Sequence, residues 1–394
     1  QTTGGLNISA GSLENDYYCI YLQDDGTIDI FDKQSEKLFP QCLQFVDEGD
    51  RGDTYNFDHV PSALVADAPI KPVAVSIVEK GQVAASVRLK AVYAIPQKLE
   101  HERDARSATR VETPITTEIS IYENIKRIDF RVSIDNRSED HRLRVLFRAP
   151  LKTGEAAVES TFGVALRSAL PESGDGCLEK PIGTTPQKCF TCVEDGSFGM
   201  ALFNRGIPEI EAASQQNETV LALTLLRCVG WLSRDDLLSR PVAAGPQFET
   251  PGAQSLGAHA FEFAFSSYSG TFHDAGIVEQ AHAYAFPPAA AITNHHRGKL
   301  KDGASLVAHD NCRIVISALE CSRSEDAYLV RMYNTTESPQ STELSFWSTK
   351  RSVMVHEVDF LEKKKSKQPL KCHGGTCEVE FRPAEIKTLQ VLIK

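Results

Sequence analysis

The feature that most constrains the fold is an alternation of apolar and polar residues with a period of two. It runs through Tyr18 to Leu22, returns on either side of Lys80-Gly81, and appears again over Ile128 to Ile134. Successive side chains of a strand point to opposite faces, so this period predicts strands with one buried face. Asp25-Gly26 lies between two such segments and predicts a hairpin with a type I′ turn. The recurring pattern predicts large antiparallel sheets packed face to face.

Helix signals are few. Ser233 is followed by Arg-Asp-Asp-Leu-Leu, which predicts one short helix with Ser233 as its cap and Asp235-Asp236 in its first turn. Residues 240–257 are rich in proline and glycine and predict a long loop. Loops of this length inside compact domains are functional or disordered, and the strand-like segments on both sides favour a functional loop.

The chain is long for a single core, because its 394 residues suit two domains. Proline and polar residues interrupt the alternation at 287–303. We therefore predict a tail at 1–13, a large β-sandwich at 14–290, a linker at 291–303 and a small β-sandwich at 304–394. Strands of the small domain are predicted at 313–319, 327–333, 342–347, 352–358 and 386–393.

Composition excludes two classes of partner. The net charge of −11 opposes binding to nucleic acid, which needs a basic face. The sequence contains no apolar run of the about 20 residues that a membrane span requires. It also opens without a signal peptide, and a chain that begins at Gln1 is expected to be a fragment or a processed product.

Ten cysteines are too few for a disulfide scaffold in a chain of this length. The close pairs are Cys189 with Cys192, and Cys372 with Cys377. They lie too far apart in the sequence to suggest a four-ligand zinc site. Free thiols are the main expectation, while a local disulfide or a structural metal stays open as an alternative.

An acidic segment at 47–57 is the sharpest local feature. Its spacing does not match that of a calcium-binding EF-hand loop. Two interpretations stay open from the residues alone. The segment is either a tight acidic turn before a strand, or a sugar-binding loop in which carboxylates accept hydroxyl hydrogen bonds and Tyr55 stacks on a sugar ring.

Several motifs in sequence order resemble one enzyme family. They begin with Glu14-Asn15-Asp16-Tyr17-Tyr18 and include a Gly-Asp-x-Tyr-x-Phe segment at 52–57 and Asp-His-Arg-Leu-Arg at 140–144. Further similar segments lie at 201–209, 223–236 and 383–388. From about Glu14 to its last residues, the chain resembles the C-terminal β region of glycoside hydrolase family 38 α-mannosidases. The resemblance is closest to the bacterial mannosylglycerate hydrolase-like branch.

The resemblance implies an all-β fold: a large galactose-mutarotase-like antiparallel β-sandwich, or supersandwich, followed by a smaller β-sandwich. It also implies retaining hydrolysis of terminal α-mannosides, which uses a carboxylate nucleophile and an acid/base carboxylate. In the family these groups, and zinc or another divalent cation, belong to an N-terminal catalytic domain. We therefore expect no catalytic residue, metal ligand or cofactor in this chain, and no activity of the chain alone.

The partners implied are the N-terminal catalytic domain of the same enzyme and an α-mannoside substrate. We expect no nucleic acid or membrane partner and a cytoplasmic location. Whether the protein forms a homo-oligomer stays open.

The resemblance also implies four substrate-binding candidates. Tyr55 matches the tyrosine that reaches the sugar in the family's active site, and Asp53 would orient that tyrosine or a substrate hydroxyl. Arg227 or Arg234 would correspond to an arginine that faces the catalytic site. For Arg142 and Arg144, salt bridges to Asp140 or Glu159 that support the sheet are expected instead. The acidic pair at 235–236 is expected to be structural.

Two other hypotheses remain. One is a stand-alone carbohydrate-binding or mutarotase-like module, for which His141, His259 and Glu262 have the residue types of a general acid and base. The other is a purely structural domain that only stabilises or oligomerises a larger enzyme.

Overall fold

The computed structural model describes residues 5–62, 64–295, 297–298, 300, 302–323, 326–347 and 353–393. The chain divides into two compact units. Unit 1 comprises Gln1–Val158 and Leu166–Ala275, and unit 2 comprises Glu159–Ala165 and Gly276–Lys394. The predicted domain boundaries stay a prediction. The positions outside the described residues are 1–4 of the predicted tail, 63 of the large sandwich, 296, 299 and 301 of the linker, and 324–325, 348–352 and 394 of the small sandwich.

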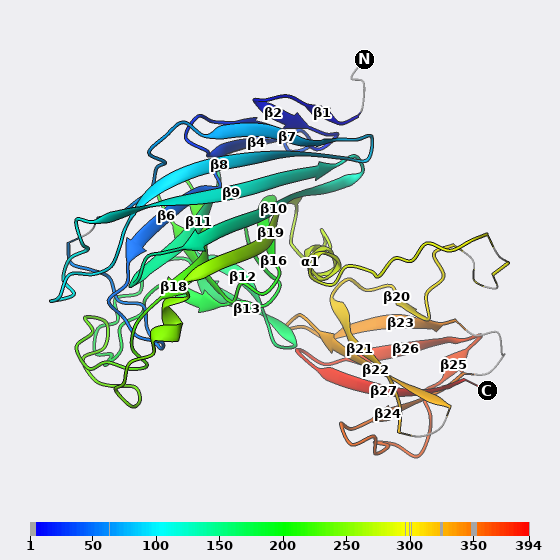
Figure 1. Cartoon of the computed structure of the whole chain (residues 1–394). Helices are drawn as coiled ribbons and strands as arrows, with labels where there is room; N and C mark the ends of the chain where they lie inside the picture. The colour runs from blue at the N-terminus through cyan, green and yellow to red at the C-terminus, as the bar shows by residue number, and fades with distance from the viewer. Residues whose placement is uncertain are drawn as a thin grey trace. The chain divides into compact units, whose positions relative to one another are not determined.

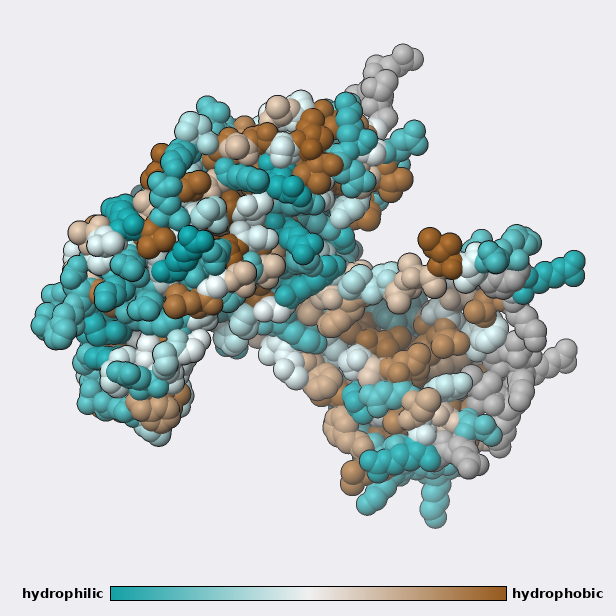
Figure 2. Space-filling view, in the orientation of Figure 1, coloured by the Kyte–Doolittle hydropathy of each residue, from teal (hydrophilic) through white to brown (hydrophobic). Residues whose placement is uncertain are grey.

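Unit 1 is built around a nine-stranded antiparallel sheet in the order β13-β12-β15-β16-β19-β10-β9-β8-β7 (Figure 1). Its uncovered face carries mainly polar side chains, as the alternation requires (Figure 2). The strands are β7 (Ala74–Lys80), β8 (Ala84–Pro96), β9 (Arg110–Tyr122), β10 (Ile125–Asn136), β12 (Glu155–Ser160), β13 (Gly163–Ser168), β15 (Phe190–Glu194), β16 (Phe198–Asn204) and β19 (Gly257–Ser269).

Two five-stranded sheets complete this unit. One has the order β14-β17-β18-β11-β6 and consists of β6 (Gln44–Gly49), β11 (His141–Ala149), β14 (Thr184–Pro186), β17 (Glu209–Ser214) and β18 (Thr219–Cys228). The other is the meander β1 (Asn7–Ile8), β2 (Ser12–Glu14), β3 (Tyr18–Leu22), β4 (Ile28–Asp32) and β5 (Lys37–Cys42). A short 3-10 helix, η1 (Pro251–Gln254), lies in the connection from β18 to β19.

The core of unit 1 lies between these sheets. Phe130 on β10 contacts Phe147 on β11 with ring centroids 5.4 Å apart, and Phe39 on β5 contacts Phe265 on β19 at 5.1 Å. All four side chains are almost completely buried. Full burial of one such side chain contributes about 1.5–3 kcal/mol. The three sheets therefore share one hydrophobic core, and the predicted face-to-face packing is confirmed.

Unit 2 is a smaller sandwich of two four-stranded sheets. One contains β20 (Val307–His309), β23 (Gln340–Phe346), β25 (Cys372–His373) and β26 (Thr376–Phe381). The other contains β21 (Ile314–Cys321), β22 (Ala327–Asn334), β24 (Val353–Val358) and β27 (Ile386–Ile393). Val330, Leu344 and Phe381 lie in the core between the two sheets. The helix α1 (Ile277–Ala285) precedes them, and the sequence did not predict it.

The predicted all-β class and the strand segments of the small sandwich are confirmed, with β20, β25 and β26 as additions. The type I′ turn is wrong, because five residues separate β3 from β4 and only Gly26 has a positive φ, 84°. The helix predicted after Ser233 is also wrong. The Ser233 hydroxyl instead accepts the N–H groups of Ala244 and Gly245, so it caps a loop.

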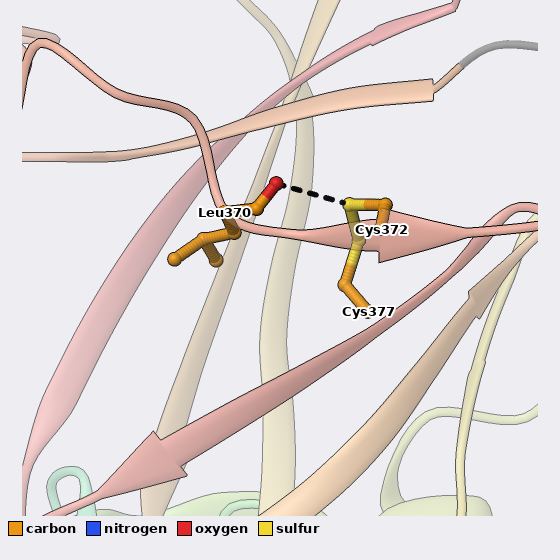
Figure 3. The surroundings of a disulfide bond; sticks show 3 residues. All are labelled: Leu370, Cys372 and Cys377. Carbon is orange, nitrogen blue, oxygen red and sulfur yellow. Dashed lines mark hydrogen bonds between the residues drawn. A yellow bond between two sulfur atoms is a disulfide. The ribbon is translucent and has the colours of Figure 1, made fainter.

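One cysteine pair corrects the expectation of free thiols. Cys372 and Cys377 are cross-strand partners on β25 and β26 and form a disulfide (Figure 3). Facing positions in an antiparallel pair bring two side chains close enough for such a bond. The local disulfide, left open as an alternative, is therefore the outcome here. Cys189 and Cys192 are both buried and form no disulfide.

Candidate functional site

The acidic loop of residues 50–58 follows β6 and folds on its own carboxylates. The Asp50 carboxylate accepts the N–H groups of Gly52 and Asp58, at 2.8 and 3.2 Å. One oxygen of Asp53, Oδ1, accepts the N–H groups of Tyr55 and Asn56, both at 3.0 Å. Such turns are the usual local chemistry of aspartate. Gly52 is obligatory, because a β-carbon there would lie 2.0 Å from the carbonyl oxygen of Asn56.

Long-range contacts then fix Asp53. Its second oxygen, Oδ2, accepts the backbone N–H of Arg234 at 2.8 Å and Nη2 of Arg240 at 2.5 Å. Arg227 donates from Nη2 to the Asp53 carbonyl oxygen. Asp53 is completely buried. The structure thus brings together the predicted residues Asp53, Arg227 and Arg234, and adds Arg240, which the sequence analysis missed.

The remaining acids of the loop are paired in the same way. Arg227 Nε lies 2.9 Å from Asp50 Oδ2, and Asp50 is completely buried. Burial raises the pKa of Asp50, although the charge of Arg227 opposes this shift. Asp58 accepts the N–H groups of Leu238 and Ser239 at 2.8 and 2.9 Å.

These loop carboxylates are already occupied by backbone N–H groups and guanidinium groups. A divalent cation would have to displace those donors, since a carboxylate oxygen ligates through the same lone pairs. Asp50, Asp53 and Asp58 therefore do not fit a metal site.

Arg234 and the acidic pair that follows it do not form a helix start. The guanidinium of Arg234 donates twice to Asp236, from Nε and Nη2, both at 2.7 Å. This hydrogen bonding lowers the pKa of Asp236. The same guanidinium lies 5.0 Å from the ring centroid of Trp231. The predicted structural role of Asp236 therefore takes another form, that of an ion partner for Arg234.

Tyr55 is the exposed aromatic residue of the loop. Its side chain is 53% exposed, although its backbone N–H is held by Asp53. The hydroxyl lies against Gly245, where an added β-carbon would be 2.9 Å from the hydroxyl oxygen. Tyr55 also lines a cavity of about 760 Å³ in unit 1. The predicted residue is thus a phenol presented on the wall of a cavity by a fixed turn.

Behind the loop, two arginines support the sheet. Arg142 donates to Glu48 at 2.8 and 3.1 Å, and its guanidinium lies 3.4 Å from the ring centroid of Phe57. Arg144 pairs with Glu48 at 2.9 Å and with Glu211. The predicted sheet-supporting salt bridges are confirmed, but the predicted partners are wrong. The ion partners come from β6 and β17, and β6 is a direct neighbour of β11.

His141 is a buried ion at the base of this region. Its Nδ1 lies 2.5 Å from Asp47 Oδ2, and its Nε2 lies 3.0 Å from Asn136 Oδ1. Both partner atoms are acceptors, because the Asn136 amide nitrogen donates to the carbonyl oxygens of Gln254 and Ser255. Both ring nitrogens must therefore donate, which requires the imidazolium. Burial opposes this charge, but Asp47 outweighs it and raises the pKa of His141 to about 10.

The acid and base candidates of a mutarotase do not converge. His259 and Glu262 lie three positions apart on β19, in an unbroken register with β10, so their side chains point to opposite faces. Glu262 pairs with Arg205, and His259 Nε2 lies 2.7 Å from the Ser255 carbonyl oxygen. With His141 buried as an imidazolium, these residues do not form an acid–base pair across a cleft.

Known proteins match the chain over nearly its whole length. The model of the glycosyl hydrolases family 38 C-terminal domain matches residues 13–237, and that of the family's C-terminal beta sandwich domain matches residues 313–389. A protein of Halalkalibacterium halodurans described as a "Putative mannosylglycerate hydrolase" is 23% identical over 97% of this chain and 42% of its own length. No helix among the described residues is long and apolar enough to cross a membrane.

Two solved structures from Enterococcus faecalis share the fold. An alpha-mannosidase superposes with a TM-score of 0.83 at 26% identity, over 98% of this chain and 43% of its own. A glycosyl hydrolase family 38 protein superposes with a TM-score of 0.80 at 24% identity, over 98% and 44%. The chain spans less than half the length of these relatives. It belongs to glycosyl hydrolase family 38, of which it carries both C-terminal domains.

Proposed function

We propose that this chain is the C-terminal, non-nucleophilic part of a retaining α-mannosidase. In this proposal it packs on an N-terminal catalytic domain, which supplies the nucleophile, the acid/base carboxylate and a divalent cation such as zinc. The chain lends Tyr55 to the pocket that holds a terminal α-mannoside. The observation that carries the proposal is the geometry of Tyr55, a half-exposed phenol on a turn that buried ion pairs hold in place.

Tyr55 suits contact with a sugar for two reasons. Its ring offers an apolar face to the C–H groups of a sugar, and its hydroxyl donates and accepts hydrogen bonds. Asp53 and the arginines that contact it act on the sugar only through Tyr55, because their own polar groups form hydrogen bonds within the protein. We therefore assign Asp53, Arg227 and Arg234 as positioning residues and keep direct contact for Tyr55.

The test is Tyr55→Phe in the enzyme that combines this chain with its catalytic domain. Loss of one hydrogen bond to the substrate should lower kcat/KM for an aryl α-mannoside about tenfold, with the unfolding midpoint unchanged. Tyr21→Phe is a matched control, since Tyr21 is 47% exposed and lies on β3. An unchanged kcat/KM for Tyr55→Phe would favour a purely structural role of the chain.

Inactivity of the isolated chain belongs to the same proposal. Hydrolysis of an aryl α-mannoside by this polypeptide alone, at a rate comparable with the complete enzyme, would contradict it. A cytoplasmic location is also part of the proposal. Eight of the ten cysteines form no disulfide, which favours this location, whereas the Cys372–Cys377 disulfide is unusual for it. Homo-oligomerisation stays a prediction.

A further inference from the structure

The disulfide of unit 2 holds a strand that has few other contacts to hold it (Figure 3). β25 pairs only with β26 among the strands of the described residues. Its two residues, Cys372 and His373, face Cys377 and Thr376 across the hairpin. A hairpin of two short strands is only marginally stable by itself. The sulfur–sulfur bond is therefore the main attachment of β25 to the sandwich.

The segment that leads into β25 covers an edge of the sandwich. β24 is the last strand of its sheet, and residues 363–371 run along its outer edge. The backbone N–H of Lys365 donates to the Glu357 carbonyl oxygen at 2.9 Å, and that of Leu370 donates to the Val355 carbonyl oxygen at 2.8 Å. The chain then crosses to the other sheet, where β25 meets β26. The disulfide thus ties this covering segment to the second of the two sheets.

The two sulfur atoms differ in their access to solvent. Cys377 is 1% exposed and lies in the core of unit 2, whereas Cys372 is partly exposed. A thiol in solution attacks the sulfur that it can reach, which is that of Cys372. Lys371 precedes Cys372 and lines a groove of about 770 Å³. A cationic neighbour favours the thiolate form of an incoming thiol, so the bond is open to attack from one side.

The other eight cysteines form no disulfide. Two of them, Cys177 and Cys321, are exposed. Exposed thiols stay unpaired in compartments where cellular reductants keep them reduced. Disulfides found in such compartments are usually transient, catalytic or redox-sensing. One accessible disulfide among unpaired thiols therefore fits a bond that forms and breaks.

We propose that Cys372–Cys377 is a redox-sensitive crosslink of unit 2 that a cellular thiol reductant opens. A thiolate of the reductant attacks Cys372 Sγ, the sulfur–sulfur bond breaks, and Cys377 Sγ leaves as a thiolate that takes a proton from water. A second thiol of the reductant then displaces Cys372, which is protonated in the same way. The reductant loses two electrons and becomes a disulfide, and the cysteine pair gains them.

Opening the crosslink has a local consequence. β25 and the segment 363–371 lose their attachment to β26, whose edge then becomes exposed. The strands of unit 1 have their own hydrophobic core and are not affected. Reduction therefore loosens one part of unit 2, as a local opening and not as unfolding of the chain.

The experiment equilibrates the full chain in buffers of reduced and oxidised glutathione and measures amide hydrogen exchange by mass spectrometry. In a buffer with the ratio typical of the cytosol, the disulfide should open, so alkylation after unfolding should rise from eight to ten thiols per chain. Amides of residues 370–378 should then exchange at least about tenfold faster. Amides of β10 in unit 1 should keep their exchange rates and serve as the internal control.

Two variants separate the disulfide from other thiol chemistry. Cys372→Ser should reproduce the reduced state, with fast exchange at 370–378 that no longer depends on the buffer. Cys372 is partly exposed, so this change spares the core. Cys321→Ser is the matched control, because Cys321 lies on β21 of the same unit, is exposed and forms no disulfide. It should respond to glutathione as the wild type does.

Either of two results would overturn the inference. A disulfide that stays intact at the cytosolic ratio would be a permanent crosslink. Equal exchange of residues 370–378 in the oxidised and reduced chains would show that opening the bond does not loosen unit 2. Both results come from the wild-type chain, so they hold even if Cys372→Ser does not fold, and neither depends on the role of Tyr55.

Discussion

Two turns, one in each unit, are formed by the same local hydrogen bonds to an aspartate but differ in the long-range contacts of that aspartate. In unit 1, Asp53 Oδ1 accepts the N–H groups of Tyr55 and Asn56. In unit 2, Asp359 Oδ1 accepts those of Leu361 and Lys363 at 2.9 and 2.8 Å. Each turn presents a large exposed apolar residue, Tyr55 in one and Phe360, 65% exposed, in the other.

The difference lies in the second carboxylate oxygen. Asp53 Oδ2 receives the N–H of Arg234 and the guanidinium of Arg240, both distant in sequence. No donor among the described residues hydrogen-bonds to Asp359 Oδ2. A single aspartate is therefore enough to form a turn, whereas donors from a second segment are needed to hold that turn, and the side chain on it, in one position. Three predictions test this difference.

The largest effect is expected for Asp53→Ala. It leaves the Arg240 guanidinium buried without its ion partner, which costs about 3–5 kcal/mol of unfolding free energy. Asp359→Ala removes only turn hydrogen bonds and should cost about 1 kcal/mol. Trp231 lies in unit 1 and Trp347 in unit 2, and they are the only tryptophans, so Trp347→Phe and Trp231→Phe backgrounds report urea unfolding of each unit by fluorescence. Equal losses in the two variants would contradict the comparison.

The two units should also respond to pH in opposite directions. The pKa of His141 is raised to about 10, so the stability it contributes is complete below about 6.5, its unfolded pKa, and is lost as pH rises toward 10. In unit 2, burial and nearby Lys364 lower the pKa of His356, so its contribution is present above about 6.5 and is lost as pH falls below that value.

The same fluorescence assay, repeated across pH 5 to about 10, measures both responses. Unit 1 should lose stability as pH rises toward the alkaline end, and this loss should be absent from the His141→Gln variant. Unit 2 should lose stability as pH falls toward the acidic end. Parallel pH profiles of the two units would contradict the charge states assigned to His141 and His356.

The smallest effect is expected for Gly245→Ala. Its new β-carbon would lie 2.9 Å from the Tyr55 hydroxyl, so the ring must shift by a few tenths of an ångström. Gly245 does not have a positive φ, so backbone strain adds little. In the enzyme with its catalytic domain, kcat/KM should fall about two- to fivefold through misplacement of Tyr55, with stability unchanged. Gly252→Ala, which meets nothing within 4 Å, is the control. Identical kinetics for both variants would show that Gly245 does not position Tyr55.

Local sequence predicted much of the secondary structure, but it failed where side chains find partners outside their own segment. Residues 233–238 contain the composition of a capped helix, yet the structure uses Ser233 to hold Ala244 and Gly245 and Asp236 to hold Arg234. These side chains have partners outside the segment, and such partners override a weak local helix preference. The hairpin after β3 was predicted correctly, but its type I′ turn was predicted wrongly. An Asp-Gly pair reports a reversal of the chain, while the loop length sets the turn.

The family motifs named four of the residues around the candidate site, Asp53, Tyr55, Arg227 and Arg234, but not how they work together. Arg240 lies in the proline-rich loop that was expected to be functional, and no spacing rule connects it to Asp53, 187 residues away. The signal that could have found it was the excess of arginines after position 226, opposite an acidic loop that needed partners.

The sequence alone determined the features that depend on neighbouring residues. The period of two sets which face of each strand is buried, and the ordered motifs identify the family, because both are properties of the chain read in order. The tertiary structure alone decided the pairing of charges: Asp53 with Arg240, Arg144 with Glu211, and His141 between Asp47 and Asn136. Ion pairs act over a few ångströms, so their partners are set by which strands and loops become neighbours.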